Sequence, residues 1–298
     1  MSIGDVNREL LVRYLDTWTP TALHGARRAT FAQAWRGPAD VGMAEAALRV
    51  FAEFTDRLRG RQLTVVLVAP ETKPLTERLD AVQAELGTPA ELAVHAVAGD
   101  PAGQLPVALK AAGAAGAPLL AYLDGTGPVT GGKPSEAIVV EPAGGWTELR
   151  RTLQDKGCTL AAGVELVDGA DSRLVGFGTG SAKSLEAFKN CLWAVDEYAG
   201  VRYRDPTDPE GHLMDISLSP HPGPLRRELL AHLDAAGPCS VTELRHFTLT
   251  ETVYRASDAV RVLTALLSAG AVTREPERGR LGGDVVITPA TATRRPPG

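Results

Sequence analysis

The sequence predicts a doubly wound, mostly parallel α/β sheet with an antiparallel hairpin at one edge, followed by a small helical module. Three observations lead to this prediction. Short apolar runs alternate with longer helical patterns through the first half of the chain, which is the signature of βαβ units. Two later apolar runs are joined by a tight turn. A proline-rich stretch then separates these runs from the last helical patterns.

Composition is that of an ordinary globular protein. The 298 residues are 44% hydrophobic and 22% charged, which suits one large domain and a smaller one. The net charge of −5 and the pI near 5.7 argue against a strongly basic protein that coats nucleic acid. The N-terminus carries Asp5, Arg8 and Glu9 without an apolar core, so we expect no signal peptide.

The sequence gives no sign of a membrane span or a metal site. No window reaches the roughly 18 uninterrupted apolar residues that a transmembrane helix needs. Cys158, Cys191 and Cys239 are far apart and form no Cys-x-x-Cys pair. We therefore expect no metal and no disulfide framework, free buried thiols, and a cytoplasmic location.

The elements of the sheet can be placed from their periodicity. The clearest strand is 62–69, because its nearly continuous apolar run suits a strand covered on both faces. Pro20 is expected to end the first helix, and the stretch 33–42, with Trp35, to form a loop. Strands are expected over residues 27–32, 62–69, 90–97, 119–123 and 136–140. Helices are expected over residues 9–18, 43–58, 74–86, 104–114 and 146–155.

An antiparallel hairpin follows these elements. Residues 159–166 and 173–178 read as its two strands, with Asp168-Gly169-Ala170-Asp171 at the turn. A helix over 184–197 comes next. A hairpin at the end of an otherwise parallel sheet is typical of methyltransferase-like, or Rossmann-like, mixed sheets. We therefore assign residues 1–200 to a methyltransferase-like α/β domain.

The remainder of the chain predicts a linker and a second domain. Residues 201–224 are polar and proline-rich, as expected of a linker. Ser240, with Glu243 three residues on, forms a capping box that opens the second of three helices. The helices are expected over 225–233, 240–246 and 255–269, and two short strands over 271–274 and 284–288. This pattern describes a winged helix-turn-helix over 225–290, followed by a disordered tail over 291–298.

Two carboxylates stand at the ends of predicted strands. The run 119–123 ends on Asp124, and Asp100 closes the strand at 90–97. Ligands of open α/β sheets bind at the carboxyl ends of strands, and we expect these two ends to be neighbours, or nearly so, at one crevice. Asp124 is the best catalytic candidate. Either carboxylate could instead cap the following helix.

Two glycine-rich segments are better explained as turns than as phosphate-binding loops. The segment 127–134 lacks the Ser or Thr that a P-loop places after its lysine, because Pro134 stands there. The segment 176–180 comes late in the chain, whereas a dinucleotide fingerprint opens the sheet. We interpret this second segment as a turn and a helix cap.

The order and spacing of several short segments resemble the three-Cys-motif partner (TcmP) family. The segments are LLVRYLDTW at 10–18, GMAEAAL at 42–48, Gly99-Asp100, Leu123-Asp124-Gly125-Thr126-Gly127, FKNCLW at 188–193 and Val253-Tyr254. The resemblance covers nearly the whole chain. It implies an S-adenosylmethionine-dependent methyltransferase fold with a C-terminal winged helix. It also implies a partner that contains a three-cysteine motif, an iron–sulfur or radical-type protein.

This chain departs from that family at the cofactor loop. The family's first strand ends in Asp-x-Phe-Ala-Gly-Pro-Gly, whereas this chain has Ala29-Thr30-Phe31-Ala32-Gln33-Ala34-Trp35. The aspartate and both glycines are missing, and a β-carbon at those places crowds the backbone where a nucleoside would lie. Ala69 replaces the acidic residue that ends the second strand, with Glu71 two residues on as a substitute. The residues in place to contact a cofactor are Phe31, Ala32, Trp35, Glu71, Asp100 and Asp124.

Three functions compete. The first is a divergent, non-catalytic methyltransferase-like protein that acts as a partner or scaffold, and the loss of the glycine loop favours it. The second is an active methyltransferase that binds S-adenosylmethionine through a rebuilt loop. The third is a DNA-binding protein, although residues 225–298 hold ten arginines against eight acidic residues, a weak excess for gripping DNA. The residues that would contact DNA are Arg255, Arg261, Arg274, Arg278 and Arg280.

Overall fold

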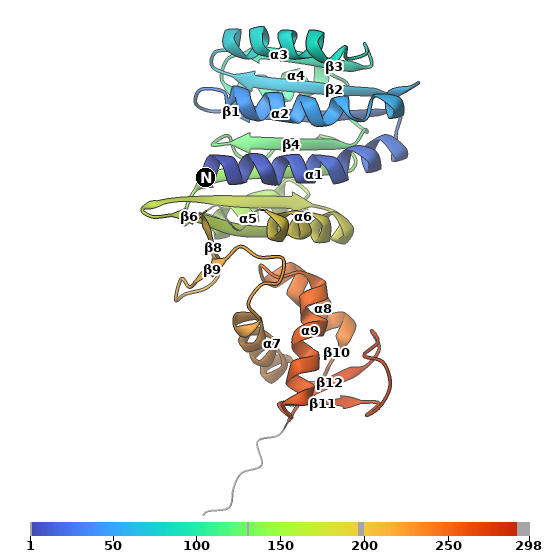
Figure 1. Ribbon diagram of the computed structural model, residues 1–298, viewed down its shortest axis with the longest axis vertical. Helices are drawn as coiled ribbons and strands as arrows, with labels where there is room; N and C mark the ends of the chain where they lie inside the picture. Colours follow the sequence, from blue (N-terminus) through green and yellow to red (C-terminus); the bar gives the residue numbers. More distant parts are fainter. Residues whose placement is uncertain (1, 130, 196–199, 291–298) are drawn as a thin grey trace, which may run out of the picture. The chain divides into compact units, whose positions relative to one another are not determined.

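A nine-stranded mixed sheet forms the centre of the first of two structural units (Figure 1). The computed structural model describes residues 2–129, 131–195 and 200–290. The chain divides into the units Met1–Leu218 and Ser219–Gly298. The strand order in the large sheet is β3-β2-β1-β4-β5-β7-β6-β8-β9. The strands are β1 Arg28–Trp35, β2 Gln62–Ala69, β3 Leu92–Ala98, β4 Leu119–Asp124, β5 Ser135–Pro142, β6 Leu160–Asp168, β7 Asp171–Thr179, β8 Arg202–Arg204 and β9 Leu213–Asp215.

The pairing confirms a mostly parallel α/β sheet with antiparallel strands at one side. The first five strands, β1 to β5, pair in parallel. The hairpin strand β7 pairs antiparallel with both β5 and β6. Its position beside β5 extends the sheet by two strands, and β8 and β9 add two more.

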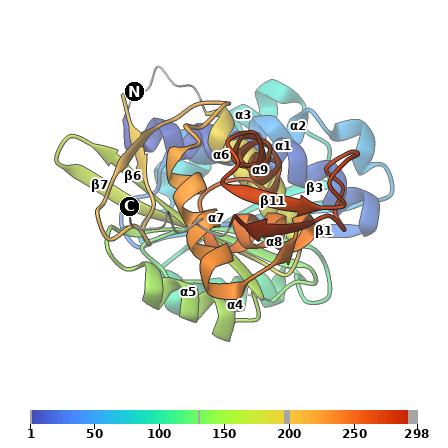
Figure 2. The same ribbon diagram turned by 90° about the horizontal axis from the view of Figure 1, so that it is seen from below.

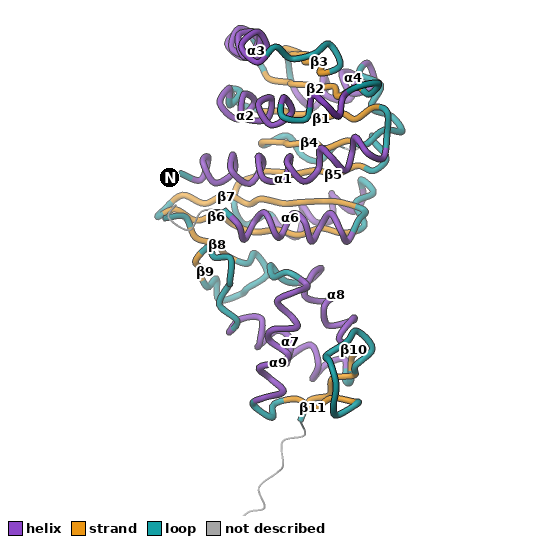
Figure 3. Tube along the Cα trace, turned by 45° about the vertical axis from the view of Figure 1, so that its right-hand side comes forward, coloured by secondary structure: helices purple, strands orange, loops and turns teal. Residues whose placement is uncertain are grey.

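Helices cover both faces of this sheet (Figure 2). On one face, α1 lies between α2 and α6 (Figure 3). On the opposite face, α4 packs on β1 and β2, and α5 packs on β6 and β7. The helices are α1 Ile3–Gly25, α2 Val41–Ala52, α3 Lys73–Leu86, α4 Pro101–Ala111, α5 Trp146–Asp155 and α6 Ala182–Ala194, with a short 3-10 turn η1 at Thr55–Leu58.

The central strands are apolar on both sides because both sides are covered. In β1, Ala32 and Ala34 belong to the core beneath α4 and α5, whereas Phe31 packs edge-to-face on Phe51 of α2 with ring centroids 5.2 Å apart. The alternation continues to the end of the strand, so Gln33 and Trp35 share the Phe31 side. This alternation determines which residues of β1 can face a ligand.

Strand β1 ends three residues later than the sequence predicts. We expected it to end at Ala32 and a loop to begin at Gln33. Instead it pairs with β4 as far as Trp35, and every residue after Arg28 is buried. The reason is that Gln33-Ala34-Trp35 contains no glycine and can pair on both sides, with Ala34 opposite Val68 of β2.

Helix α1 continues through Pro20, where we expected it to end. A proline removes one backbone N–H and is unfavourable inside a helix. Here the neighbouring hydroxyls add bonds within the helix, as Thr19 Oγ1 donates to the Leu15 carbonyl at 2.7 Å. Burial of Trp18 and Leu23 on either side of the proline favours the helical path. Tertiary packing therefore outweighs the local signal.

The glycines of the hairpin lie beneath α5. A β-carbon on Gly163 would lie 2.5 Å from Cε3 of Trp146, and one on Gly176 would lie 2.6 Å from Cδ2 of Leu149. Gly176 lies within β7 and not in the turn that we expected for the segment 176–180, because the glycines here allow close contact between helix and sheet. The expected cap is also present, because the Ser181 hydroxyl accepts the Ser184 N–H at 3.2 Å.

Part of the expected linker, 201–224, belongs to the sheet. Strand β8 pairs with β6, and Tyr203 is fully buried against Trp193 with ring centroids 5.4 Å apart. The Tyr203 hydroxyl donates to the Leu192 carbonyl at 2.8 Å. Proline content signalled irregular backbone, but one aromatic residue holds this segment to the core. The last two residues of the helix expected over 184–197 lie outside the described residues.

Over its described residues, 219–290, the second unit contains three helices and a three-stranded antiparallel sheet of order β10-β12-β11. The capping box at Ser240 is confirmed, since Ser240 Oγ and Glu243 Oε2 each accept a backbone N–H from the other residue. The winged-helix assignment stays a prediction, and the tail 291–298 lies outside the described residues. The elements are α7 Gly223–Ala236, β10 Cys239–Ser240, α8 Val241–Glu251, α9 Ala256–Ser268, β11 Val272–Glu275 and β12 Val286–Pro289.

Candidate functional site

A pocket of about 530 Å³ opens beside Asp124 at the carboxyl end of β4. Its volume suits a small molecule. Three parts of the chain form it, namely the start of α1, the ends of β4 and β5, and the hairpin turn between β6 and β7. The lining residues are Ser2, Ile3, Gly4, Asn7, Asp124, Val140, Pro142, Asp168, Asp171, Ser172 and Arg173.

Asp124 is half-buried at this pocket. Loss of solvent is the main cause that raises the pKa of its carboxyl group above the usual value, and the negative charge of Asp40 acts in the same direction. Arg173 opposes the shift through its positive charge. A carboxylate of this kind is a poised hydrogen-bond acceptor or proton acceptor, but perturbed carboxylates also occur at structural sites.

The start of α1 contributes a buried polar atom to the same pocket. Asn7 is 6% exposed, and its Oδ1 has no hydrogen-bond partner among the described residues. Buried polar atoms are normally satisfied, so this oxygen is available to a donor from a ligand or water. The pocket also holds the carboxylates of Asp124, Asp168 and Asp171 against one guanidinium, that of Arg173. Its charge therefore favours a ligand rich in hydrogen-bond donors over an anion.

The three β1 residues named as cofactor contacts are buried in the strand. Phe31 and Ala32 have no exposed surface, and Trp35 is 1% exposed. The Trp35 indole N–H has no partner among the described residues, nor have the two polar atoms of the Gln33 side chain, which is fully buried. The glycines of the resembling family stand at the positions of Gln33 and Trp35. Side chains therefore fill the place where those glycines would leave space.

The two other acidic residues named for the cofactor are exposed and lie apart from Asp124. Glu71 follows β2, and Asp100 precedes α4 without a capping hydrogen bond from its side chain. We expected the ends of the Asp100 and Asp124 strands to be neighbours, or nearly so. The order β3-β2-β1-β4 instead places two strands between them, about 14 Å at the usual strand spacing. The pocket beside Asp124 is lined by neither Glu71 nor Asp100.

The helix after β1 has its N-terminus occupied by a side chain of this protein. The Asp40 carboxylate accepts the Met43 N–H at 2.8 Å and lies 3.8 Å from a guanidinium nitrogen of Arg8. Helix N-termini are common sites for the anionic groups of ligands. Here a carboxylate already supplies the negative charge that this helix end would attract.

The residues present do not fit S-adenosylmethionine in the position that the resemblance implies. The fit fails on three features: Trp35 and Gln33 replace the glycines, Ala69 replaces the acid at the end of β2, and Asp40 caps α2. Ala69 is also fully buried. No chemical step through this cofactor follows from the structure.

The arginines named for DNA contact are mostly engaged within their own unit. Arg255 Nε donates to Asp258 at 2.9 Å, and Arg261 lies 3.3 Å from the same carboxylate. Arg274 donates to the carbonyls of Pro276, Gly279 and Arg280, which fastens the turn between β11 and β12. Arg278 and Arg280 are exposed. Three of the five side chains therefore have structural partners.

Sequence reasoning did not find Asn7, Asp168, Asp171 or Arg173 as residues of the site. The two aspartates were noted only as a turn, and Asn7 precedes the helix that we expected over 9–18, whereas α1 begins at Ile3. No local pattern marks them, because the pocket exists only when the start of α1 lies beside the carboxyl ends of β4 and β5.

Within the described ranges, no helix is long and apolar enough to cross a membrane. The same residues contain no cluster of three or more histidine, cysteine, aspartate or glutamate side chains arranged to hold a metal ion. The three cysteines are free and buried.

No family model matches the chain, and no curated protein matches it. Among solved structures, the chain is similar to a predicted O-methyltransferase from Agrobacterium tumefaciens, at 15% identity and a TM-score of 0.30. The similarity covers 57% of this chain and 81% of the other.

Proposed function

We propose that this protein is a divergent methyltransferase-like protein that does not bind S-adenosylmethionine at the end of β1 and acts as a non-catalytic partner or scaffold. One observation carries the proposal: β1 stays paired with β4 through Trp35, whose side chain is 1% exposed. In the resembling family a glycine loop occupies this place. A paired strand with a buried indole leaves no room there for a nucleoside.

Isothermal titration with S-adenosylmethionine and with S-adenosylhomocysteine tests the proposal. We expect no binding heat at millimolar ligand. Binding in the micromolar range would overturn the non-catalytic assignment. A matched Trp35→Gly variant shows whether the indole is the obstacle, because it restores one of the two missing glycines. If Trp35→Gly gains binding while the parent protein has none, the indole is what closes the site.

The partner role rests on the resemblance to the three-Cys-motif partner family. It predicts that this chain forms a complex with a purified protein containing a three-cysteine motif, detected by co-elution in size-exclusion chromatography. Co-elution supports the scaffold role. Its absence, together with binding of S-adenosylmethionine, would favour the second candidate.

The second candidate is an active S-adenosylmethionine-dependent methyltransferase with a rebuilt cofactor site. The pocket beside Asp124 favours it, because a carboxylate of raised pKa there faces a space of about 530 Å³. This candidate requires that a nucleoside raise the melting temperature and that Asp124→Ala abolish the effect in a folded protein. Failure of every nucleoside to stabilise the parent protein would exclude it.

A further inference from the structure

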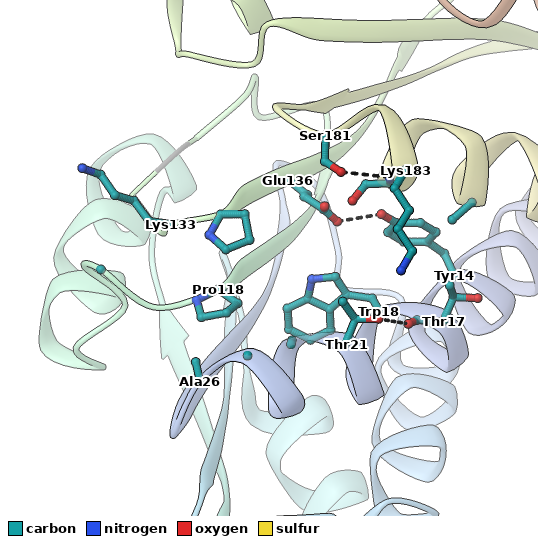
Figure 4. A pocket seen from close by; sticks show the side chains of 16 residues that line it. Tyr14, Thr17, Trp18, Thr21, Ala26, Pro118, Lys133, Glu136, Ser181 and Lys183 are labelled. Carbon is teal, nitrogen blue, oxygen red and sulfur yellow. Dashed lines mark hydrogen bonds between the residues drawn. The ribbon is translucent and has the colours of Figure 1, made fainter. Parts of the chain in front are cut away.

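A second pocket, of about 380 Å³, lies at the amino ends of β4 and β5 (Figure 4). It is at the opposite edge of the sheet from Asp124, since Pro118 precedes β4 and Pro134 precedes β5. The second half of α1 and the first turns of α6 complete its walls. Ligands of this fold class normally bind at the carboxyl edge, so this pocket is not part of the site described above.

A buried carboxylate lies at this pocket. Glu136 is 3% exposed. The Tyr14 hydroxyl donates to Glu136 Oε2 at 2.6 Å, and the Thr179 hydroxyl donates to Oε1 at 3.3 Å. Loss of solvent, and then the charge of Glu136, raises the pKa of Tyr14 well above its usual value. Tyr14 is therefore a fixed donor, and Glu136 is the acceptor.

Glu136 retains unused capacity for hydrogen bonds. An ionised carboxylate offers about four acceptor positions, and Tyr14 and Thr179 use two of them. Among the described residues, no arginine, lysine or histidine forms an ion pair with Glu136 within 4.0 Å. A buried carboxylate without a cation is costly. A ligand with a positively charged hydrogen-bond donor would supply the cation that Glu136 lacks.

The rest of the pocket determines the other features of its ligand. The Trp18 indole, 6% exposed, forms an apolar wall together with Ala22, Pro118 and Pro134. In Figure 4 the Lys183 side chain extends from α6 over the space beside Tyr14 and Thr17. Lys133 also lines the pocket, but its side chain points away from these residues. The pocket thus combines one buried negative group, an apolar wall and one positive group near its opening.

We propose that this pocket binds an apolar α-amino acid. Its ammonium group meets the carboxylate of Glu136, its carboxylate meets the ammonium of Lys183, and its side chain lies against Trp18. The proposal is independent of the state of the cofactor site. A simple amine would leave Lys183 without a partner, and a simple carboxylate would be repelled by Glu136.

The proposal is tested by adding L-tryptophan, L-phenylalanine or L-leucine to the full chain. Binding is measured by thermal shift and by isothermal titration. We expect at least one of the three to raise the melting temperature in proportion to its concentration. Tryptamine lacks the carboxylate and indole-3-propionate lacks the ammonium group, so each should bind at least tenfold more weakly than L-tryptophan. If no amino acid of the panel binds, or if both analogues bind as well as L-tryptophan, the proposal is wrong.

Two exposed lysines provide a matched pair of variants. Lys183→Met should weaken amino-acid binding about tenfold, because it removes one charged hydrogen bond. Lys133→Met should leave binding unchanged, because its side chain points away from Tyr14 and Thr17. Equal effects of the two variants would overturn the placement of the ligand. Both positions are exposed, so both proteins should fold.

Glu136→Gln is the second test of the same site. The amide oxygen can still accept the Tyr14 hydroxyl, so circular dichroism should show a folded protein. We expect loss of amino-acid binding, and unchanged binding in the folded variant would contradict the role of Glu136. S-adenosylmethionine itself carries an α-amino acid group, so it could also bind in this pocket. Any binding heat that it gives with the parent protein is therefore measured again with the Lys183→Met variant. Heat that survives this substitution belongs to another site and bears on the cofactor question instead.

Discussion

Trp35 and Asp124 are register partners at the carboxyl ends of β1 and β4. The amide N–H of Arg36, next to Trp35, donates to the Asp124 carbonyl at 3.0 Å. One member of the pair is a buried indole, and the other is a half-buried carboxylate that faces a pocket. The closed end of β1 and the pocket at the end of β4 therefore lie on adjacent strands.

Truncation of Trp35 should destabilise the protein strongly. Trp35→Ala removes a fully buried side chain, and we expect the free energy of unfolding to fall by about 3–5 kcal/mol. Urea denaturation measures the loss. Val107→Ala is the control, because Val107 is 63% exposed and its truncation should change stability by less than about 0.5 kcal/mol. A loss below about 1 kcal/mol at Trp35 would show that the indole is loosely held.

The raised pKa of Asp124 predicts a pH-dependent effect of its replacement. The folded protein favours the neutral carboxyl group, so stability falls as the pH rises from the unfolded pKa towards the folded pKa, and the loss is complete above the folded pKa. Asp124→Asn should therefore be more stable than the parent protein at pH 7. This advantage should disappear as the pH falls below about 3.9, the unfolded value. Denaturation curves at several pH values test it, and an advantage that does not change with pH would contradict it.

The buried thiols should react slowly. Loss of solvent raises the pKa of Cys158 to about 11 and that of Cys191 to about 11. At pH 8 their thiolate fraction should be on the order of 100-fold below that of an ordinary cysteine, with modification slowed at least as much. Ellman's reagent measures this rate, with the protein in guanidinium chloride as the fully reactive control. Rapid reaction of either thiol in the native protein would be inconsistent with their burial.

Close packing of α5 on the hairpin predicts sensitivity at Gly163. A β-carbon there would lie 2.5 Å from the Trp146 ring, so Gly163→Ala should cost about 1–3 kcal/mol through overpacking. Gly180→Ala is the matched control, because nothing lies within 4 Å of its added carbon. Thermal unfolding of the two variants compares them. Equal stability of both would mean that α5 moves aside at no cost.

The arrangement of arginines in the second unit predicts weak or absent binding of duplex DNA. Arg255, Arg261 and Arg274 are engaged in contacts within the unit. Only Arg278 and Arg280, of the five named arginines, are exposed without a described partner for their side chains. We expect no retardation in a gel shift at low salt. The DNA-binding hypothesis would be restored if the protein retards DNA and the double variant Arg278→Ala/Arg280→Ala does not.

Much of the fold could be predicted because its signals are local. The run Gln62–Ala69 was found with the bounds that the structure shows, since a strand covered on both faces must be apolar throughout. Helix α5 was found equally well, at Trp146–Asp155. The capping box of Ser240 and Glu243 was found because both partners lie within four residues of sequence. The residues that determine such elements lie within the elements themselves.

Where prediction failed, a distant part of the chain decided the outcome. Pro20 lies inside α1 because residues on both sides of it pack into the core. Tyr203 holds β8 to the sheet through Trp193 and Leu192. Neither set of contacts can be predicted from neighbouring residues in the sequence. In both places proline indicated a break in regular structure, and long-range packing produced a helix or a strand instead.

The sequence by itself determined the alternation of elements, the sheet with its terminal hairpin, and the absence of glycine from residues 29–35. Each of these depends on residue types at short spacing. Only the tertiary structure decided that β1 remains paired through Trp35, that two strands separate Asp100 from Asp124, and that Tyr14 meets Glu136 across 122 residues of sequence. Strand order and helix placement depend on the apolar surface buried over the whole domain. No short stretch of sequence shows this total.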